Sequence, residues 1–321
     1  MFKKIAIAAT LVCATILSVP ASAQDQLRFS AGPPGGNWFA LGGALAETWS
    51  QAGIATSSST GGGVSNVVNA DRGKTDLGFS VTALVGAASK GAEPFKKPLG
   101  NVSVLANVYR QYTYFVMRKD YAEKNGVKSV ADIVDKKLPI RLATLKPGTS
   151  SEFVIRAAFE KGLGVGWKDI KDWGGTVSFA SYSDGSNQLA DNHLDCFAFS
   201  VGKAASVVLK IESQLDVVIL PVDKKILDAM TEALGTVSFE IDPEIYKSVT
   251  EPVPTIGDYT SIIVRSDLDE DTVFNLTKTL WENKETLQKG VKAVSELNPQ
   301  EAIPASAPAH PGAVKFWKSV Q

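Results

Sequence analysis

Short apolar runs alternate along the chain with longer stretches in which apolar residues recur every three or four positions. Residues 26–30, 54–59 and 76–80 have the length and composition of strands, and residues 38–51 and 64–72 have the spacing of helices that bury one face. Strands and helices that follow one another in this way predict an α/β protein.

The same alternation starts again after residue 130. A helix over 130–135, a strand over 140–144 and a helix over 151–162 open the second series. The remaining predicted strands are 102–109, 113–118, 177–180, 196–200, 217–221 and 259–265, and the remaining predicted helices are 185–192, 204–214, 269–282 and 285–297.

These two series predict two lobes. Lobe 1 is expected to comprise residues 24–115 together with 256–321, and lobe 2, residues 116–255, is inserted between these parts. Two lobes joined by two crossing segments leave a cleft between them, and ligands commonly bind in such clefts.

The first residues have the pattern of a signal peptide. Lys3 and Lys4 precede an apolar stretch over 5–19, and small residues follow up to Ala23. Export to the periplasm with cleavage after Ala23 is therefore predicted. Cys13 lies in the removed segment, so Cys196 is the single cysteine of the mature chain. An intramolecular disulfide is therefore excluded, and the apolar run around Cys196 predicts a buried free thiol.

Composition narrows the class of partner. The chain has 321 residues, of which 44% are hydrophobic, so it can bury a sizeable core. Its net charge of −1 provides no basic surface for a polyanion, and we expect no nucleic-acid partner.

Three loops carry the candidate chemistry. Residues 32–37, 60–63 and 147–151 are rich in glycine and hydroxyl residues, and each leads from a predicted strand into a helix. Glycine lets the backbone approach a ligand, and the first N–H groups of a helix attract anions. Ordinary capping of the helices by Asn37, Thr60 or Ser150 is the alternative explanation for each loop.

Motifs for catalysis and metal binding are nearly missing from the sequence. His193 and His310 are the only histidines and are far apart, and no nucleotide-binding glycine motif opens a helix. We expect no metal, no cofactor and no catalytic residues. Ser200 and Lys203 have the S-x-x-K spacing of acyl enzymes, which leaves an exported serine hydrolase as an unfavoured alternative.

Several side chains near the predicted cleft are suited to an organic anion. Trp38 and Tyr109 could pack on its carbon chain, Arg110 is either a carboxylate partner or a surface charge, and Gln111 and Tyr112 follow in the same segment.

At these residues the chain resembles the TAXI family, the solute receptors of one class of tripartite ATP-independent periplasmic (TRAP) transporters. The resemblance rests on the motifs at 35–38, 60–66, 73–78 and 147–151, on Tyr109, and on His310-Pro311-Gly312-Ala313 near the end. The chain departs from the family pattern at Gly63, where serine is usual, at Thr149-Ser150-Ser151, and at Arg110-Gln111.

The resemblance implies a two-lobed, type II-like periplasmic-binding-protein fold that closes on a small organic anion, such as glutamate, 2-oxoglutarate or a related carboxylate. The protein would be a monomer that delivers its ligand to TRAP membrane subunits; a domain that reports to a sensor is the other possibility. The predicted ligand-binding residues are Asn37, Trp38, Gly62, Gly63, Asn66, Tyr109, Thr149, Ser150 and Ser151.

Overall fold

The computed structural model describes residues 26–321. The predicted signal peptide, residues 1–23, and Cys13 lie outside the described residues. Within the described part, no helix is both long enough and apolar enough to cross a membrane.

One hydrogen-bonded sheet runs through the molecule, with the strand order β2-β1-β3-β10-β4-β7-β5-β6; β8 pairs with β4 and β9 with β10. The strands are β1 (Leu27–Ser30), β2 (Thr56–Ser59), β3 (Leu77–Val81), β4 (Ser103–Arg118), β5 (Arg141–Thr144), β6 (Thr176–Phe179), β7 (Cys196–Gly202), β8 (Val217–Ile219), β9 (Val237–Ile241) and β10 (Val253–Val264).

The two ends of this sheet repeat one arrangement. In the first half, β1 lies between β2 and β3 and is parallel to both, and β10 is antiparallel to β3. In the second half, β5 lies between β6 and β7 and is parallel to both, and β4 is antiparallel to β7. Loops at the carboxyl ends of both parallel sets therefore border the same central region.

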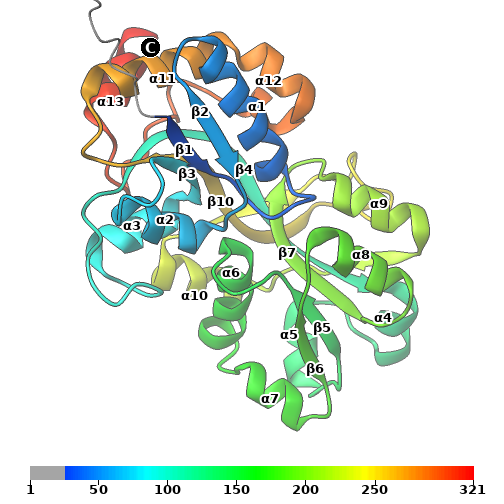
Figure 1. Cartoon of the computed structure of the whole chain (residues 1–321). Helices are drawn as coiled ribbons and strands as arrows, with labels where there is room; N and C mark the ends of the chain where they lie inside the picture. Colours follow the sequence, from blue (N-terminus) through cyan, green and yellow to red (C-terminus); the bar gives the residue numbers. More distant parts are fainter. Residues whose placement is uncertain (1–25) are drawn as a thin grey trace, which may run out of the picture.

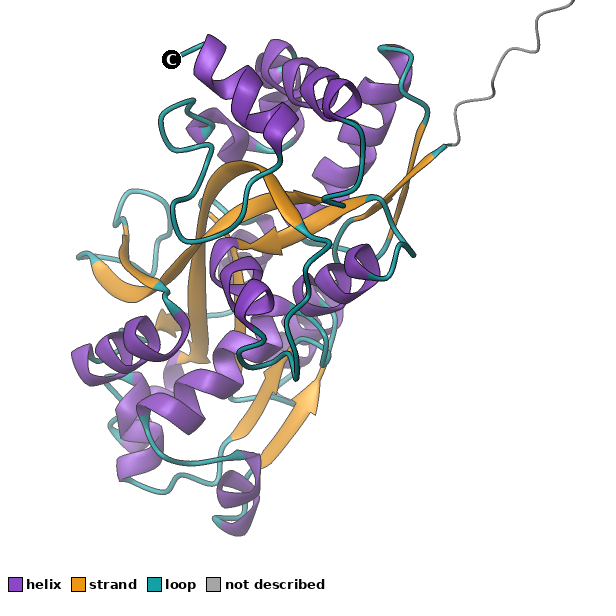
Figure 2. Ribbon diagram, turned by 90° about the vertical axis from the view of Figure 1, so that its left-hand side faces the viewer, coloured by secondary structure: helices purple, strands orange, loops and turns teal. Residues whose placement is uncertain are grey.

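Helices cover the strands in both halves (Figures 1 and 2). They are α1 (Asn37–Gln51), α2 (Gly63–Asp71), α3 (Thr82–Lys90), α4 (Lys119–Asn125), α5 (Val130–Asp135), α6 (Ser150–Ala157), α7 (Trp167–Asp172), α8 (Tyr182–Ala190), α9 (Ser206–Gln214), α10 (Lys224–Leu234), α11 (Glu270–Glu282), α12 (Lys284–Gly290) and α13 (Pro311–Ser319), with the π-helix η1 (Ala158–Gly162) and the 3-10 helix η2 (Lys292–Glu296).

Strands β4 and β10 are long, and each pairs with strands of both halves. The part of β4 from Ser103 to Tyr112 pairs with β10, and the part from Gln111 to Met117 pairs with β7. The sequence predicted two strands here; the structure has one, because Arg110 pairs with β10 and both Gln111 and Tyr112 have strand partners on both sides. The predicted lobe boundaries at 115/116 and 255/256 fall within β4 and β10.

Burial in the core explains why the strands are apolar runs in the sequence. Every residue of β3 and of β7 is buried, since helices cover both faces of the sheet. In α1, Trp38, Leu41, Leu45 and Trp49 form the buried face. Cys196 is fully buried in β7, as predicted, and burial raises the pKa of its thiol.

Candidate functional site

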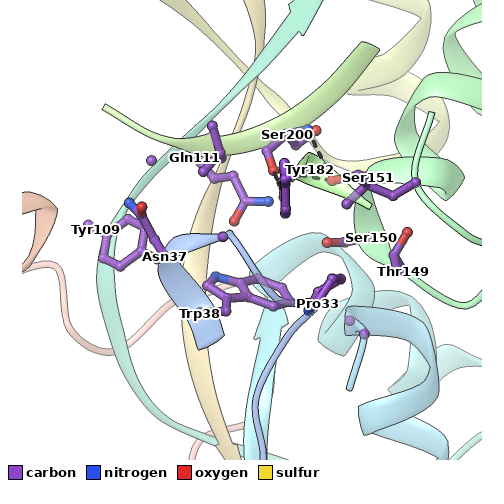
Figure 3. Close-up of a pocket in the computed structure, with 16 residues that line it drawn as sticks. Pro33, Asn37, Trp38, Tyr109, Gln111, Thr149, Ser150, Ser151, Tyr182 and Ser200 are labelled. Carbon is purple, nitrogen blue, oxygen red and sulfur yellow. Dashed lines mark hydrogen bonds between the residues drawn. The ribbon is translucent and has the colours of Figure 1, made fainter. Parts of the chain in front are cut away.

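A cavity lies where the two parallel strand sets face each other, and the space between its lining atoms is about 340 Å³ when the open solvent at its mouth is included. Figure 3 shows its side chains converging from both halves. The lining residues are Pro33, Gly36, Asn37, Trp38, Gly62, Gly63, Tyr109, Gln111, Leu145, Thr149, Ser150, Ser151, Tyr182, Ser200, Val201 and Gly202.

Four helices begin at this cavity. The first residues of α1, α2, α6 and α8 line it, namely Asn37, Gly63, Ser150 and Tyr182. The first N–H groups of a helix have no partner within the helix, and the helix dipole places partial positive charge there. Two helix N-termini from each half therefore surround the cavity with hydrogen-bond donors.

Trp38 and Gln111 are held in place by one threonine. The indole Nε1–H of Trp38 donates to Thr260 Oγ1 at 3.0 Å, and Thr260 Oγ1 donates to Gln111 Oε1 at 2.7 Å. Because indole is only a donor, the threonine proton is left for the Gln111 oxygen. The Gln111 amide nitrogen is consequently on the side of the cavity (Figure 3).

The Tyr109 hydroxyl is buried beside Thr260 and Trp38, but makes no hydrogen bond of standard geometry with another described residue. The side chain is 2% exposed, and burial raises its pKa. It therefore stays protonated at neutral pH. A buried hydroxyl without a partner is uncommon, and here it borders an empty cavity that would hold one.

On the other wall, Ser151 and Tyr182 are fixed by the backbone of Ser200. Ser151 Oγ donates to Ser200 O at 3.1 Å and accepts from Ser200 N–H at 3.0 Å, and Tyr182 Oη donates to the same carbonyl at 2.9 Å. Burial raises the pKa of Tyr182 to about 12, which keeps this donor protonated.

The two halves touch beside the cavity. The Ser65 N–H, in the first turn of α2, donates to the Gly148 carbonyl at 3.0 Å. A β-carbon added at Gly62 would lie 2.8 Å from the Gly148 oxygen, so the two glycine loops are in direct backbone contact. A second, outer cavity of about 750 Å³ opens past these loops and has Lys146 at its rim.

The sequence model of the NMT1-like family matches residues 29–320. The chain belongs to the NMT1-like family. No curated protein sequence matches it.

Solved structures show which fold this member of the NMT1-like family has. The periplasmic binding protein BugD superposes with a TM-score of 0.54 at 16% identity, over 92% of this chain and 93% of BugD. The nitrate-binding protein NrtA from Synechocystis PCC 6803 gives 0.47 at 12% identity, over 83% and 65%. The substrate-binding protein of an amino acid ABC transporter gives 0.47 at 13% identity, over 84% and 98%. The fold is the two-lobed, type II-like α/β fold of periplasmic binding proteins.

Of the nine residues predicted for the site in this NMT1-like protein, eight line the cavity. Asn66 does not: it is fully buried, accepts from Ser30 Oγ and Gly62 N–H, and donates to three backbone carbonyls. These bonds tie together the end of β1, the middle of β3 and the loop before α2. Asn66 therefore positions the glycine loop and has no donor left for a ligand.

Arg110 points away from the cavity because side chains alternate along β4 between Tyr109 and Gln111. Its guanidinium lies 5.6 Å from the Phe239 ring centroid and 4.0 Å from a Glu301 carboxylate oxygen. Of the two interpretations of Arg110, the structure therefore agrees with the surface charge.

The acyl-enzyme alternative fails on geometry. The Ser200 hydroxyl lies 2.9 Å from Thr113 Oγ1, whereas the Lys203 ammonium pairs with Asp242 and does not line the cavity. No base is therefore placed to activate the serine. Among residues 26–321, no three His, Cys, Asp or Glu side chains are grouped to hold a metal ion.

Sequence reasoning missed part of the wall. Gln111 was placed near the cleft without a role, although the alternation of side chains along a strand pairs it with Tyr109. Tyr182 was missed because the helix was predicted to start at Gly185. Ser181 and Asp184 have capping spacing, and Ser181 does accept from the Asp184 N–H at 3.1 Å.

Proposed function

We propose that this protein is an exported solute receptor that binds a small organic anion and passes it to membrane subunits of a transporter. In finer terms it would be a periplasmic TAXI-type receptor of a TRAP transporter. Three of the motifs that carry this resemblance, at 35–38, 60–66 and 147–151, belong to the loops around the cavity.

One observation carries the proposal: donors without partners converge on a cavity between the halves. Four helix N-termini and the Tyr109 hydroxyl face a space lined by neutral side chains. Such a site stabilises a carboxylate without a charged partner, since backbone N–H groups and hydroxyls bind anions well.

Closure would couple binding to delivery. Residues 24–115 with 256–321 form lobe 1 in this proposal, and residues 116–255 form lobe 2. A solute held by Gly63 from one lobe and Ser150 from the other stabilises the closed form more than the open one. The membrane subunits would then distinguish the closed receptor from the open one.

The first test is thermal unfolding of the chain from Gln24 with panels of carboxylates, amino acids and sugars. A solute at about 100 times its Kd adds roughly 2.7 kcal/mol to the unfolding free energy, or several degrees. A shift confined to carboxylates is the expected result. If no compound shifts the transition and mass spectrometry of the denatured protein finds no carried ligand, the proposal is wrong.

A matched pair of variants locates the site. Tyr109→Phe removes the unpartnered hydroxyl at the cavity, and Tyr121→Phe removes another buried unpartnered hydroxyl that lies on α4, outside it. We expect the first to reduce the ligand-induced shift and the second to leave it intact. Equal effects would contradict this placement.

A further inference from the structure

The charge of the cavity wall restricts what this receptor can hold. No Asp or Glu of the described chain lines the central cavity or the outer one, and Lys146 is the charged side chain at the rim. The acids nearest in sequence are committed elsewhere: Glu152 pairs with Arg156 at 3.1 Å, and Asp184 accepts from Ser181 Oγ at 2.7 Å.

Two of the acceptors that face the cavity are already occupied. Gln111 Oε1 accepts from Thr260, and the Ser200 carbonyl accepts from both Ser151 and Tyr182. A carbonyl oxygen has two lone pairs, so this one is saturated. The groups that remain include donors, namely the Gln111 amide nitrogen, the Tyr109 hydroxyl and the first N–H groups of four helices. The Asn37 amide and the Ser150 hydroxyl also line the cavity, and these neutral groups can both donate and accept.

An ammonium group would meet a poor environment here. It brings three donors and a positive charge, and it needs acceptors or an acid when it leaves water. Helix N-termini repel cations as they attract anions. A carboxylate, a keto oxygen or a hydroxyl oxygen, by contrast, accepts hydrogen bonds from this wall.

We infer that the solute is a carboxylate without an ammonium group, such as a keto or hydroxy acid, rather than an amino acid. This inference rests on the proposed function and narrows the class of anion that the same site takes. The juxtaposition that carries it is four helix N-termini around one cavity, with the Gln111 and Ser200 carbonyl oxygens already in use and no acid beside them.

Calorimetric titration with matched solutes tests the inference on the unmodified mature chain. Each set of three shares a carbon skeleton and differs in one group: 2-oxoglutarate, 2-hydroxyglutarate and glutamate; pyruvate, lactate and alanine; oxaloacetate, malate and aspartate. We expect a keto or hydroxy member to bind at least tenfold more tightly than its amino counterpart. An amino member that binds within tenfold of its counterpart, or more tightly, overturns the inference and leaves the proposed function standing.

The remaining outcome concerns the receptor itself. If no carboxylate of either kind binds, the proposed function is contradicted, and the inference falls with it.

Adding an acidic side chain to the cavity wall tests whether the lack of an acid is what disfavours an ammonium group. Gln111→Glu keeps an acceptor for Thr260 and places a second carboxylate oxygen at the cavity, and Ser150→Asp does the same from α6. Gln51→Glu, at the exposed end of α1, changes the net charge equally and is the control. We expect either cavity variant to move the preference at least tenfold toward the amino member; an unmoved ratio in folded variants contradicts the explanation.

Discussion

Asp258 lies on β10 next to the N-terminus of α3 and is 8% exposed. Its carboxylate accepts from the Tyr259 N–H at 2.7 Å and from the Ala83 N–H at 3.3 Å. It borders a small cavity with Phe153 and Leu234 from the other half. Burial outweighs these hydrogen bonds and raises the pKa of Asp258 to about 7.

The raised pKa of Asp258 makes the unfolding free energy depend on pH in a defined direction. Between pH 4 and 7 the folded protein holds a proton on Asp258 that the unfolded chain has lost, so stability falls as pH rises through this range. Asp258→Asn removes the ionisation. We expect its unfolding free energy to exceed that of the wild type by roughly 1–3 kcal/mol at pH 8, with little difference near pH 4.

Urea denaturation at three pH values measures this difference. Asp191→Asn, an exposed carboxylate, serves as the control and should give a small difference at each pH. A difference for Asp258→Asn that does not grow with pH would contradict the assigned burial effect.

At the scale of an element, α6 depends on its first turn. Thr149 is the N-cap: its hydroxyl accepts from the Glu152 N–H at 3.1 Å and donates to the Lys146 carbonyl at 2.8 Å. Thr149→Ala should lower the unfolding free energy by about 1 kcal/mol, as the loss of such caps does.

Denaturant titration of Thr149→Ala checks this cost. Thr231→Ala, at an exposed position of α10, is the counterpart and should be neutral or slightly stabilising, because alanine has the higher helix propensity. Equal losses in both variants would show that the cap contributes nothing.

Elements with a clear local signal were predicted from the sequence. The strands of both parallel sets and the helices after the glycine loops were found, because apolar runs and helix starts are local patterns. α3, α4, α7, α10 and α13 were not predicted as helices, and β9 was not predicted as a strand. α3 follows β3 directly without a polar side-chain cap, so no boundary separates them in the sequence.

The end of one predicted helix was also wrong. The helix over 285–297 is interrupted: α12 ends at Gly290, Val291 is extended, and η2 follows. Glycine is a weak helix former, and here the packing of η2 against β4 decides the course of the chain.

The site was predictable as far as its motifs reach. Glycine-rich loops indicate backbone that approaches a ligand or another chain segment closely. On this ground Gly62, Gly63 and Ser150 were predicted for the site, and they line the cavity. Whether a polar side chain faces the cavity or the protein depends on partners distant in the chain. Asn66 binds Ser30, Ala31 and Phe79, and no local pattern announces these contacts.

For the whole molecule, contact between the glycine loops limits how far the halves approach. Gly62 has an extended backbone with φ −165°, which any residue can adopt. A methyl group there would meet the Gly148 carbonyl at 2.8 Å and Thr149 Cα at 3.1 Å, so Gly62→Ala obstructs closure without straining either half.

We expect Gly62→Ala to weaken solute binding at least tenfold while the unfolding free energy without solute stays within about 1 kcal/mol of the wild type. Titration calorimetry measures the affinity for the solute. Small-angle scattering in the presence of solute measures the radius of gyration. Gly43→Ala, with no atoms within 4 Å of the added carbon, is the control. Unchanged affinity in Gly62→Ala would mean that the halves do not need this contact.

The elements nearest the two ends of the described chain belong to the same half. β1 pairs with β2 and β3, and α13 packs on α11 and β4, with the Trp317 indole N–H donating to the Leu105 carbonyl at 3.0 Å. If the halves close on a solute as proposed, a protein fixed to an electrode or a glass surface through its C-terminus would leave the other half free to move. A dye on that half would then report occupancy as a change in its distance from the support, which makes this chain a suitable scaffold for a reagentless sensor.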